Sequence, residues 1–169
     1  NEAIHGMLIR SGCTNIEVDG VQLQAIRGWP FWISHDGGGA VADGVWIHGD
    51  CTSTGGEMGI ACTGGANLLI EDNDAGDGLI KWATYHCIDL EPDNSTDNID
   101  HVLIQRNKFH SCGIGTAAAN FYFFTFAPGY VGPAWSSGTD IIVRDNTIVS
   151  ATPDGQGMRF HLGGSQAMP

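Results

Sequence analysis

The chain has 169 residues, of which 42% are hydrophobic and 25 are glycine, so it is long and apolar enough to fold as one domain with a sizeable core. Its 19 acidic residues against 7 Lys and Arg give a net charge of −12, which disfavours nucleic acid and anionic membranes as partners. The longest apolar stretch, AAANFYFFTFA, is too short to span a bilayer, so no membrane insertion is expected.

Short runs rich in β-branched residues, bounded by Gly, Asn and Asp, follow one another along the chain and predict strands rather than helices. In chain order, one set of runs is GMLIRSG, FWISHDG, GIACTGG, CIDLEPD, FFTFAPG and GMRFHLGG. Between its members lies a second set that aligns without gaps: NIEVDGVQL (15–23), GVWIHGDCT (44–52), NLLIEDNDA (67–75), HVLIQRNKF (101–109) and DIIVRDNTI (140–148). Constant strands joined by connections of unequal length are typical of a solenoid, because each coil contacts only its neighbours.

The aligned runs make two predictions about stacking. Their fourth positions should lie one above another in the core: Val18, Ile47, Ile70, Ile104 and Val143. Three asparagines share a later position, with Asp50 there in another coil, and they predict a ladder of stacked amides at a bend with left-handed backbone geometry: Asn73, Asn107 and Asn146. The alternative is that these asparagines only mark ordinary hairpin turns.

The repeats NLLIEDN, HVLIQRN and DIIVRDN resemble the right-handed parallel β-helix proteins of the pectin-lyase-like superfamily, and the resemblance covers nearly the whole chain. It implies an all-β, right-handed parallel β-helix (solenoid) of about six coils, forming a single domain over 1–169. Because the chain lacks an initiator Met and both ends stop inside patterned sequence, we expect a part of a longer polypeptide, incomplete at both ends. The five cysteines form no CxxC pair and are interpreted as scattered small core residues, not as a disulfide framework or a zinc site.

The superfamily includes polysaccharide lyases, glycoside hydrolases, epimerases and phage tailspikes, so the resemblance implies a carbohydrate-facing role outside the cell or on a virion (phage tail). Signatures of individual activities are absent: there is no Gly-His-Gly with paired aspartates as in polygalacturonases, and no Arg-x-Pro-x-x-Arg as in pectate lyases. The shared fold therefore does not transfer a mechanism.

Two carboxylates flank a leucine in CIDLEPDN (87–94). If Ile88 and Leu90 point inward, Asp89 and Glu91 point outward on one face, with Cα atoms roughly 6–7 Å apart. The same phase predicts two neighbouring outward columns on the sheet: Leu8, Ser34, Ala61, Asp89, Thr125 and Arg159 in one, and Arg10, Asp36, Thr63, Glu91, Ala127 and His161 in the other.

From these columns we predict Asp36, Asp89 and Glu91 as catalytic acids and bases, with Thr63 lining the cleft. Asp36 with Glu91 suits the wider carboxyl separation of inverting glycoside hydrolysis, and Asp89 with Glu91 suits the closer separation of a retaining pair. The competing interpretation is that these acids are solvated surface charges that deter edge-to-edge association.

Further candidates for sugar contact are aromatic, because aromatic faces stack on sugar rings. They are Trp32, Trp82, Tyr130 and Trp135, whereas Phe124 and Phe126 take the inward phase and are assigned to the core. Arg159 with His161 could bind an acidic sugar. No cofactor is expected; the acidic, glycine-broken segment EDNDAGDG (71–78) is a weak candidate for Ca²⁺, without EF-hand spacing.

One outward column of the aligned runs is apolar: Trp46, Leu69, Leu103 and Ile142. Contiguous exposed apolar surface marks an interface or a covered face. We favour association, as a homotrimer of the tailspike type, over a connection folded back on the strands.

The sequence favours a polysaccharide-degrading or polysaccharide-binding domain from a phage tailspike, a depolymerase or a secreted enzyme. The alternative is a non-catalytic structural or adhesin β-helix of a virion fibre or cell surface. The sugar, the linkage and the choice between hydrolysis and elimination are left open by the sequence.

Overall fold

The structure, a computed structural model, describes residues 4–35, 39–81, 83, 85–92, 96–111, 122–126, 138–149 and 156–160. Within these residues every regular element is a β-strand and no helix is present. None of the described segments is therefore a helix that could cross a membrane. The expectation of an all-β chain is confirmed.

The strands form two sheets in which every described pairing is parallel. The 6-stranded sheet has the order β1 (Met7–Ile9), β4 (Phe31–Ile33), β7 (Ile60–Cys62), β10 (Ile88–Leu90), β12 (Tyr122–Phe126) and β15 (Gln156–Phe160). The 9-stranded sheet consists of β2 (Thr14–Asp19), β5 (Ala42–His48), β8 (Gly65–Asn73), β11 (Ile99–His110) and β13 (Gly138–Arg144), extended by β3 (Gln22–Ile26), β6 (Thr52–Gly55), β9 (Ile80–Lys81) and β14 (Thr147–Val149).

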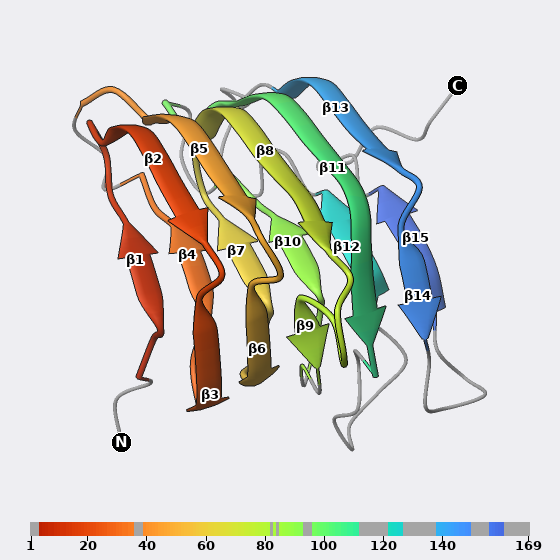
Figure 1. Cartoon of the computed structure of the whole chain (residues 1–169). Coiled ribbons are helices and arrows are strands. Elements are labelled where there is room, and N and C mark those ends of the chain that lie inside the picture. Colours follow the sequence, from red (N-terminus) through yellow and green to blue (C-terminus); the bar gives the residue numbers. More distant parts are fainter. Residues whose placement is uncertain are drawn as a thin grey trace, which may run out of the picture.

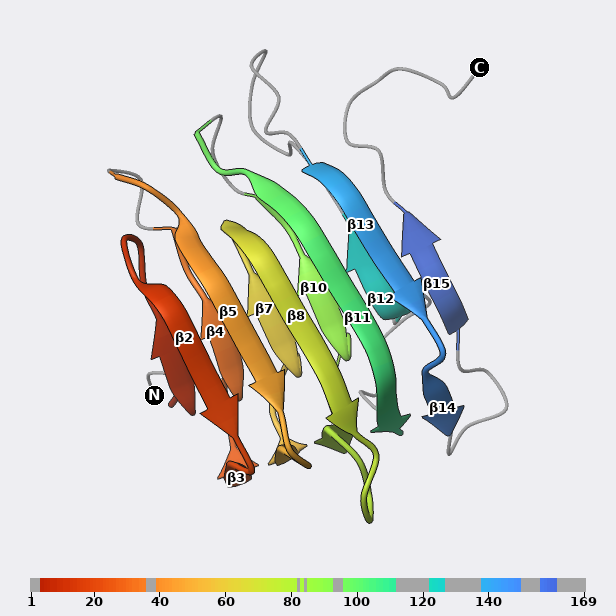
Figure 2. The same ribbon diagram turned by 45° about the horizontal axis from the view of Figure 1, so that its top comes forward.

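The chain visits these sheets in a repeating cycle. It passes from a short strand of the 6-stranded sheet to a long strand of the other sheet, then to that sheet's extension, and returns one position further along. Figures 1 and 2 show the result as two curved layers, with β2, β5, β8, β11 and β13 lying over β1, β4, β7, β10, β12 and β15. Parallel strands stacked in this way are compatible with a solenoid.

The predicted stacking of the aligned runs is confirmed. Val18 pairs with Ile47, Ile47 with Ile70, Ile70 with Ile104, and Ile104 with Val143. The central members of this column are buried, because alternation turns them toward the core while their sequence neighbours face out. Ile88, Leu90, Phe124 and Phe126 on the opposite sheet are buried as well, as their inward phase predicts.

Sharp bends recur at fixed places on either side of this column. Three positions before each stacked residue the backbone φ is positive, at Asn15, Gly44, Asn67, His101 and Asp140. Two positions after it, φ is again positive at Asp72, Arg106 and Asp145. Glycine, Asn and Asp tolerate this left-handed geometry best, which explains why they recur at the bends of the repeat.

The amide ladder is confirmed, with two corrections. Asn73 Nδ2 donates to Asn107 Oδ1 at 2.8 Å, and Asn107 Nδ2 donates to Asn146 Oδ1 at 3.1 Å. The expectation that the asparagines themselves take left-handed geometry is wrong, because the positive φ belongs to the residue before each of them. The side chains of Asn73 and Asn107 are turned inward and buried.

The second correction concerns Asp50, which does not occupy the ladder. Asp50 is itself the left-handed residue of its bend, at φ 62°, and it is exposed. The next residue, Cys51, takes the ladder position: its N–H donates to Asn73 Oδ1 at 2.8 Å, and its thiol donates to the His48 carbonyl at 3.0 Å. Gly49 also has positive φ, so this bend contains one more residue than the sequence alignment assumed.

The 6-stranded sheet corrects one predicted column. Leu8 pairs with Trp32, Trp32 with Ala61, Ala61 with Asp89 and Asp89 with Thr125, so Trp32 occupies the position predicted for Ser34. Ser34 instead lies beside Thr63, whose N–H donates to the Ile33 carbonyl at 3.0 Å. The predicted alignment of Asp36 with Thr63 is therefore wrong by two residues, and Asp36 itself lies outside the described residues.

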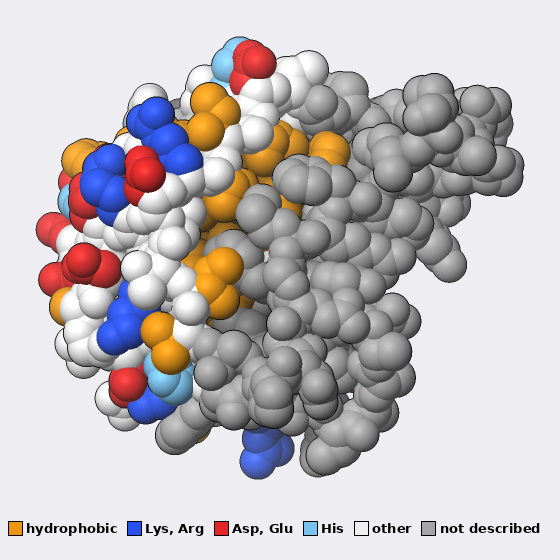
Figure 3. Space-filling model, turned by 90° about the vertical axis from the view of Figure 1, so that its right-hand side faces the viewer, with side chains coloured by type: hydrophobic (Ala, Val, Ile, Leu, Met, Phe, Trp, Pro, Cys, Tyr) orange, Lys and Arg blue, Asp and Glu red, His pale blue; other side chains and the backbone are white. Residues whose placement is uncertain are grey.

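Charged side chains lie on the outside of the stacked strands. Figure 3 views the molecule from the side of β13 to β15, and in the described part of this face Lys, Arg, Asp and Glu gather along one rim with hydrophobic side chains further in. Arg106, on the outside of β11, bonds Glu71 and Asp72 at 2.6 Å each, and these contacts lower the pKa of Asp72. Such exposed pairs contribute little to the free energy of unfolding.

The cysteine prediction needs a correction too. Cys51 and Cys62 are buried free thiols, as expected of small core residues, and Cys13 is free and half-buried. Cys87, however, is disulfide-bonded. The remaining cysteine, Cys112, lies outside the described residues.

Candidate functional site

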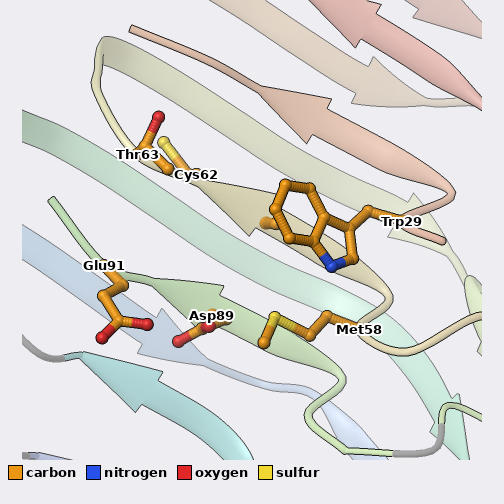
Figure 4. Close-up of a pocket in the computed structure, with 7 residues that line it drawn as sticks. Trp29, Met58, Cys62, Thr63, Asp89 and Glu91 are labelled. Carbon is orange, nitrogen blue, oxygen red and sulfur yellow. The ribbon is translucent and has the colours of Figure 1, made fainter. Parts of the chain in front are cut away.

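A cavity of about 150 Å³ opens on the outer face of the 6-stranded sheet (Figure 4). Two of the predicted catalytic residues, Asp89 and Glu91, line it together with Thr63, the predicted cleft residue. The rest of the lining comes from the middle of the same sheet: Trp29, Met58, Ala61 and Cys62. The structure thus brings together three residues that the sequence placed in one site.

Strand alternation places the carboxylates. Asp89 lies at the centre of β10 between the buried Ile88 and Leu90, so it faces away from the core. Glu91 directly follows the strand, where Pro92 ends it, and its N–H donates to the Cys62 carbonyl at 2.9 Å. From the rise of a strand, their Cα atoms are roughly 6–7 Å apart.

Neither carboxylate is an open surface charge. Asp89 is 4% exposed and Glu91 is half-buried. The alternative interpretation of these acids as solvated surface groups is therefore wrong for Asp89. Figure 4 shows the Asp89 side chain between those of Glu91 and Met58, of which Met58 comes from the segment just before β7.

A tight corner between coils holds Trp29 and Met58 over the sheet. Glu57 N–H donates to the Gly28 carbonyl at 2.9 Å, and Gly59 N–H donates to the His86 carbonyl at 2.9 Å. A Cβ at Gly59 would lie 2.5 Å from the Cys87 carbonyl oxygen, so only glycine fits there. This close approach of the backbones sets the height of Met58 above β10.

An aromatic cluster borders the cavity. The rings of Trp29 and Trp32 meet edge to face with centroids 4.5 Å apart, and the His5 ring lies 4.9 Å and 4.8 Å from them. Trp32 is the one predicted aromatic sugar contact that the structure describes, and it belongs to this cluster. His5 and Trp29 were not predicted, although Trp29 stands only three residues before Trp32 in the sequence.

Both indole N–H groups in this cluster are buried. Within the described part of the chain, Trp29 Nε1 and Trp32 Nε1 have no hydrogen-bond acceptor. Figure 4 shows the nitrogen edge of Trp29 turned toward Met58. A buried donor without an acceptor is costly, so a cavity with such a donor at its wall favours a ligand that carries hydrogen-bond acceptors.

A buried histidine supports the cavity wall from behind. The His35 backbone N–H donates to Thr63 Oγ1 at 3.1 Å, and its ring lies in the core with Nδ1 2.5 Å from Asp97 Oδ1 and Nε2 2.9 Å from the Gly39 carbonyl. Because a carbonyl oxygen only accepts, Nε2 carries a hydrogen, and a single further proton lies between Nδ1 and Asp97. Sequence reasoning missed this pair, but His35 continues the inward phase of Phe31 and Ile33, and an inward polar residue predicts a buried partner.

Cys62 is the only thiol among the described lining residues, and it is not a nucleophile. Complete burial, helped by the negative charges of Asp89 and Asp97, raises its pKa to about 12. The thiol is therefore protonated near neutral pH, whereas nucleophilic cysteines need a lowered pKa. The chemistry that the cavity can support is that of its two carboxylates.

The remaining sequence candidates are not tested by the structure. Trp82, Tyr130, Trp135 and His161 lie outside the described residues. Arg159 lies on β15 in register with Thr125, which pairs with Asp89, so its backbone is two strands from that carboxylate.

The acidic segment 71–78 contacts protein groups. Glu71 and Asp72 bind Arg106, Asn73 belongs to the ladder, and Asp77 binds Lys81. Among the residues that the structure describes, no three His, Cys, Asp or Glu side chains lie close enough together to hold a metal ion.

The apolar column of the other sheet stacks as predicted. Trp46 pairs with Leu69, Leu69 with Leu103, and Leu103 with Ile142. Trp46 is 38% exposed and Ile142 is 49% exposed, so the column reaches the surface at both ends. His48 lies flat on the Trp46 ring, with centroids 3.7 Å apart.

No known protein family, no curated protein and no solved structure matches the chain.

Proposed function

We propose that this chain is a right-handed parallel β-helix of the pectin-lyase-like type whose 6-stranded sheet binds a polysaccharide and cleaves it. The observation that carries the proposal is the shared cavity, in which two carboxylates, a hydroxyl and an indole meet on one face. Paired carboxylates act as acid and base in glycosidic bond cleavage, and an aromatic wall stacks on the sugar ring.

In this proposal Asp89 and Glu91 share the acid and base roles. Their close spacing on one strand suits the short carboxyl separation of a retaining pair better than the wide separation of an inverting pair. Thr63 is held by the His35 N–H, which occupies an acceptor site of its oxygen and leaves its own O–H to donate toward a substrate hydroxyl. Asp36 lies outside the described residues and is given no role here, and Ser34 takes its predicted place beside Thr63.

An extracellular or virion location is part of the proposal. The disulfide at Cys87 supports it, because structural disulfides persist in oxidising compartments. We also propose that the apolar column, Trp46, Leu69, Leu103 and Ile142, is the contact between copies in a homotrimer. Its continuous stacking along the sheet supports this assignment.

The test is a screen of bacterial and plant polysaccharides for new reducing ends and for unsaturated uronates, so that hydrolysis and elimination are both seen. We expect Asp89→Asn and Glu91→Gln each to lower cleavage by at least about 100-fold. Glu17→Gln, an exposed acid on the other sheet, should leave cleavage unchanged.

Binding without cleavage by the wild-type chain would favour the alternative, an adhesin or structural rod. The stacked amide ladder supports that alternative, because it stiffens the coils without any role at the cavity. Equal cleavage by wild type and both carboxylate variants would remove Asp89 and Glu91 from the site.

A further inference from the structure

The buried pair of His35 and Asp97 joins two coils that are not neighbours. His35 lies in the connection between β4 and β5, and Asp97 lies in the connection between β10 and β11. The coil between them is that of β7, which pairs with β4 on one side and with β10 on the other. Strands stack about 4.8 Å apart, so the His35 and Asp97 backbones are roughly 10 Å apart and their side chains bridge the distance.

Glycine in the middle coil makes this crossing possible. A Cβ at Gly64 would lie 2.7 Å from the His35 Cβ, so a larger residue there would push His35 away. On the other side of the same connection, the Gly65 N–H donates to the Asn98 carbonyl at 2.8 Å, next to Asp97. The connection that follows β7 is therefore held between the two coils that the buried pair joins.

Both nitrogens of the His35 ring are fixed. Nδ1 lies 2.5 Å from Asp97 Oδ1, Nε2 donates to the Gly39 carbonyl at 2.9 Å, and the two side chains of the pair are 1% and 0% exposed. Separating such a buried pair costs free energy, because each partner loses a hydrogen bond in the core. The His35 backbone N–H, which donates to Thr63 Oγ1 at 3.1 Å, is therefore held in one place.

From this geometry we infer that His35 and Asp97 are positioning residues, which hold the Thr63 hydroxyl in a single orientation at the wall of the cavity. Thr63 is half-buried and lines the cavity, and its oxygen accepts from the His35 N–H, so its own O–H donates in another direction. Side chains of a site are placed precisely when the residues behind them fix their rotamers. The inference rests on the proposed function for what Thr63 does to a ligand, but not for how Thr63 is held.

The Thr63 side chain reports on this role through the three-bond NMR couplings of its methyl carbon to the backbone nitrogen and to the carbonyl carbon. In the wild type we expect both couplings at the limiting values of a single χ1 rotamer. Asp97→Ala should move them to values averaged over more than one rotamer, because the His35 ring loses its partner. Asp97→Asn should keep the single rotamer, because an amide N–H donates to Nδ1 and brings no charge into the core.

Asn107→Ala is the matched control. It removes a buried polar group whose amide partners, Asn73 and Asn146, lie at the opposite end of β11 from Asp97. This variant should be destabilised but should keep the wild-type Thr63 couplings. If it averages them as much as Asp97→Ala does, the effect is a general loosening of the fold and the positioning role is refuted. The role is equally refuted if Asp97→Ala leaves the couplings unchanged.

A double variant keeps the test decisive if Asp97→Ala does not fold. His35→Phe with Asp97→Leu replaces the buried pair by apolar side chains, an exchange that buried pairs commonly tolerate without loss of stability. It removes the hydrogen bonds of the ring and keeps most of the packing, so the Thr63 couplings should again become averaged. Unchanged couplings would show that packing alone places Thr63, and would refute the role of the pair.

Kinetics on a polysaccharide identified by the screen separate this inference from the proposed function. Asp97→Ala should raise KM about fivefold, which corresponds to one hydrogen bond, and Asp97→Asn should leave it unchanged. Thr63→Val should raise KM as much as Asp97→Ala does, and the two substitutions together should add nothing further, because the pair acts through Thr63. Additive effects would refute that route. If the wild type neither binds nor cleaves any polysaccharide, the proposed function is refuted, while the Thr63 couplings still decide the positioning role.

Discussion

Asn107 and Asp89 are both buried polar residues on parallel strands of this chain, but their neighbours differ. Asn107 has an asparagine in the ladder on either side, and its amide bonds Asn146, the Gln105 carbonyl and the Ile70 carbonyl. Asp89 has Ala61 on one side and Thr125 on the other, and it lines a cavity. Where successive coils carry the same residue, the side chains make hydrogen bonds to one another and stabilise the fold. Where the residue differs from coil to coil, the side chains can instead form a site for a ligand.

The ladder should therefore cost stability when it is broken. Asn107→Ala removes the acceptor of the Asn73 amide and leaves the Ile70 carbonyl without its donor, both in the core. We expect a loss of about 3 kcal/mol in the free energy of unfolding, measured by urea denaturation. Gln24→Ala, on the exposed face of β3, is the control and should change stability by less than about 0.5 kcal/mol. If Asn107→Ala were as stable as Gln24→Ala, the stacked asparagine amides would not contribute to the stability of the fold.

The two buried cysteines sharpen the comparison, since one lies in the ladder and the other behind the cavity. Cys51 bonds Asn73 Oδ1 through its N–H and caps the ladder, so Cys51→Asn should extend the amide stack and cost less than about 1 kcal/mol. Cys62 lies between Ile33 and Leu90 in the core. Cys62→Asn should therefore lower the free energy of unfolding by about 2–3 kcal/mol more than Cys51→Asn does, because the new amide would be buried without a stacked amide to bind. Thermal and urea unfolding of both variants give the comparison, and the reverse order would contradict the assignment of Cys51 to the ladder.

The sequence predicted the repeating columns because stacking forces equivalent residues into equivalent environments. The alignment of Val18, Ile47, Ile70, Ile104 and Val143 and the ladder of Asn73, Asn107 and Asn146 needed only the repeat itself. The carboxylates of the cavity were found by alternation around Ile88 and Leu90, which is also a local rule.

What was missed depends on contacts that no local rule contains. Asp50 is an extra left-handed residue after Gly49, and it moved Cys51 into the place expected for Asp50 itself. A gapless alignment cannot reveal such an insertion. Trp32 and Ser34 stand two residues apart and share one face of the strand, so alternation alone cannot decide which of them pairs with Ala61. His35 and Asp97 meet across connections of irregular length, so their spacing in the sequence carries no signal.

The central claim, that the cavity beside Asp89 holds a sugar ring while the ladder is structural, is tested most directly by the ¹⁵N NMR signals of two side-chain types. On titration with an oligosaccharide that the chain binds, the indole Nε1–H signal of Trp29 should shift because the group gains an acceptor. The side-chain amides of Asn73, Asn107 and Asn146 should stay in place, because their hydrogen bonds are already made within the protein. A shift of the ladder amides with an unmoved Trp29 indole would contradict the account.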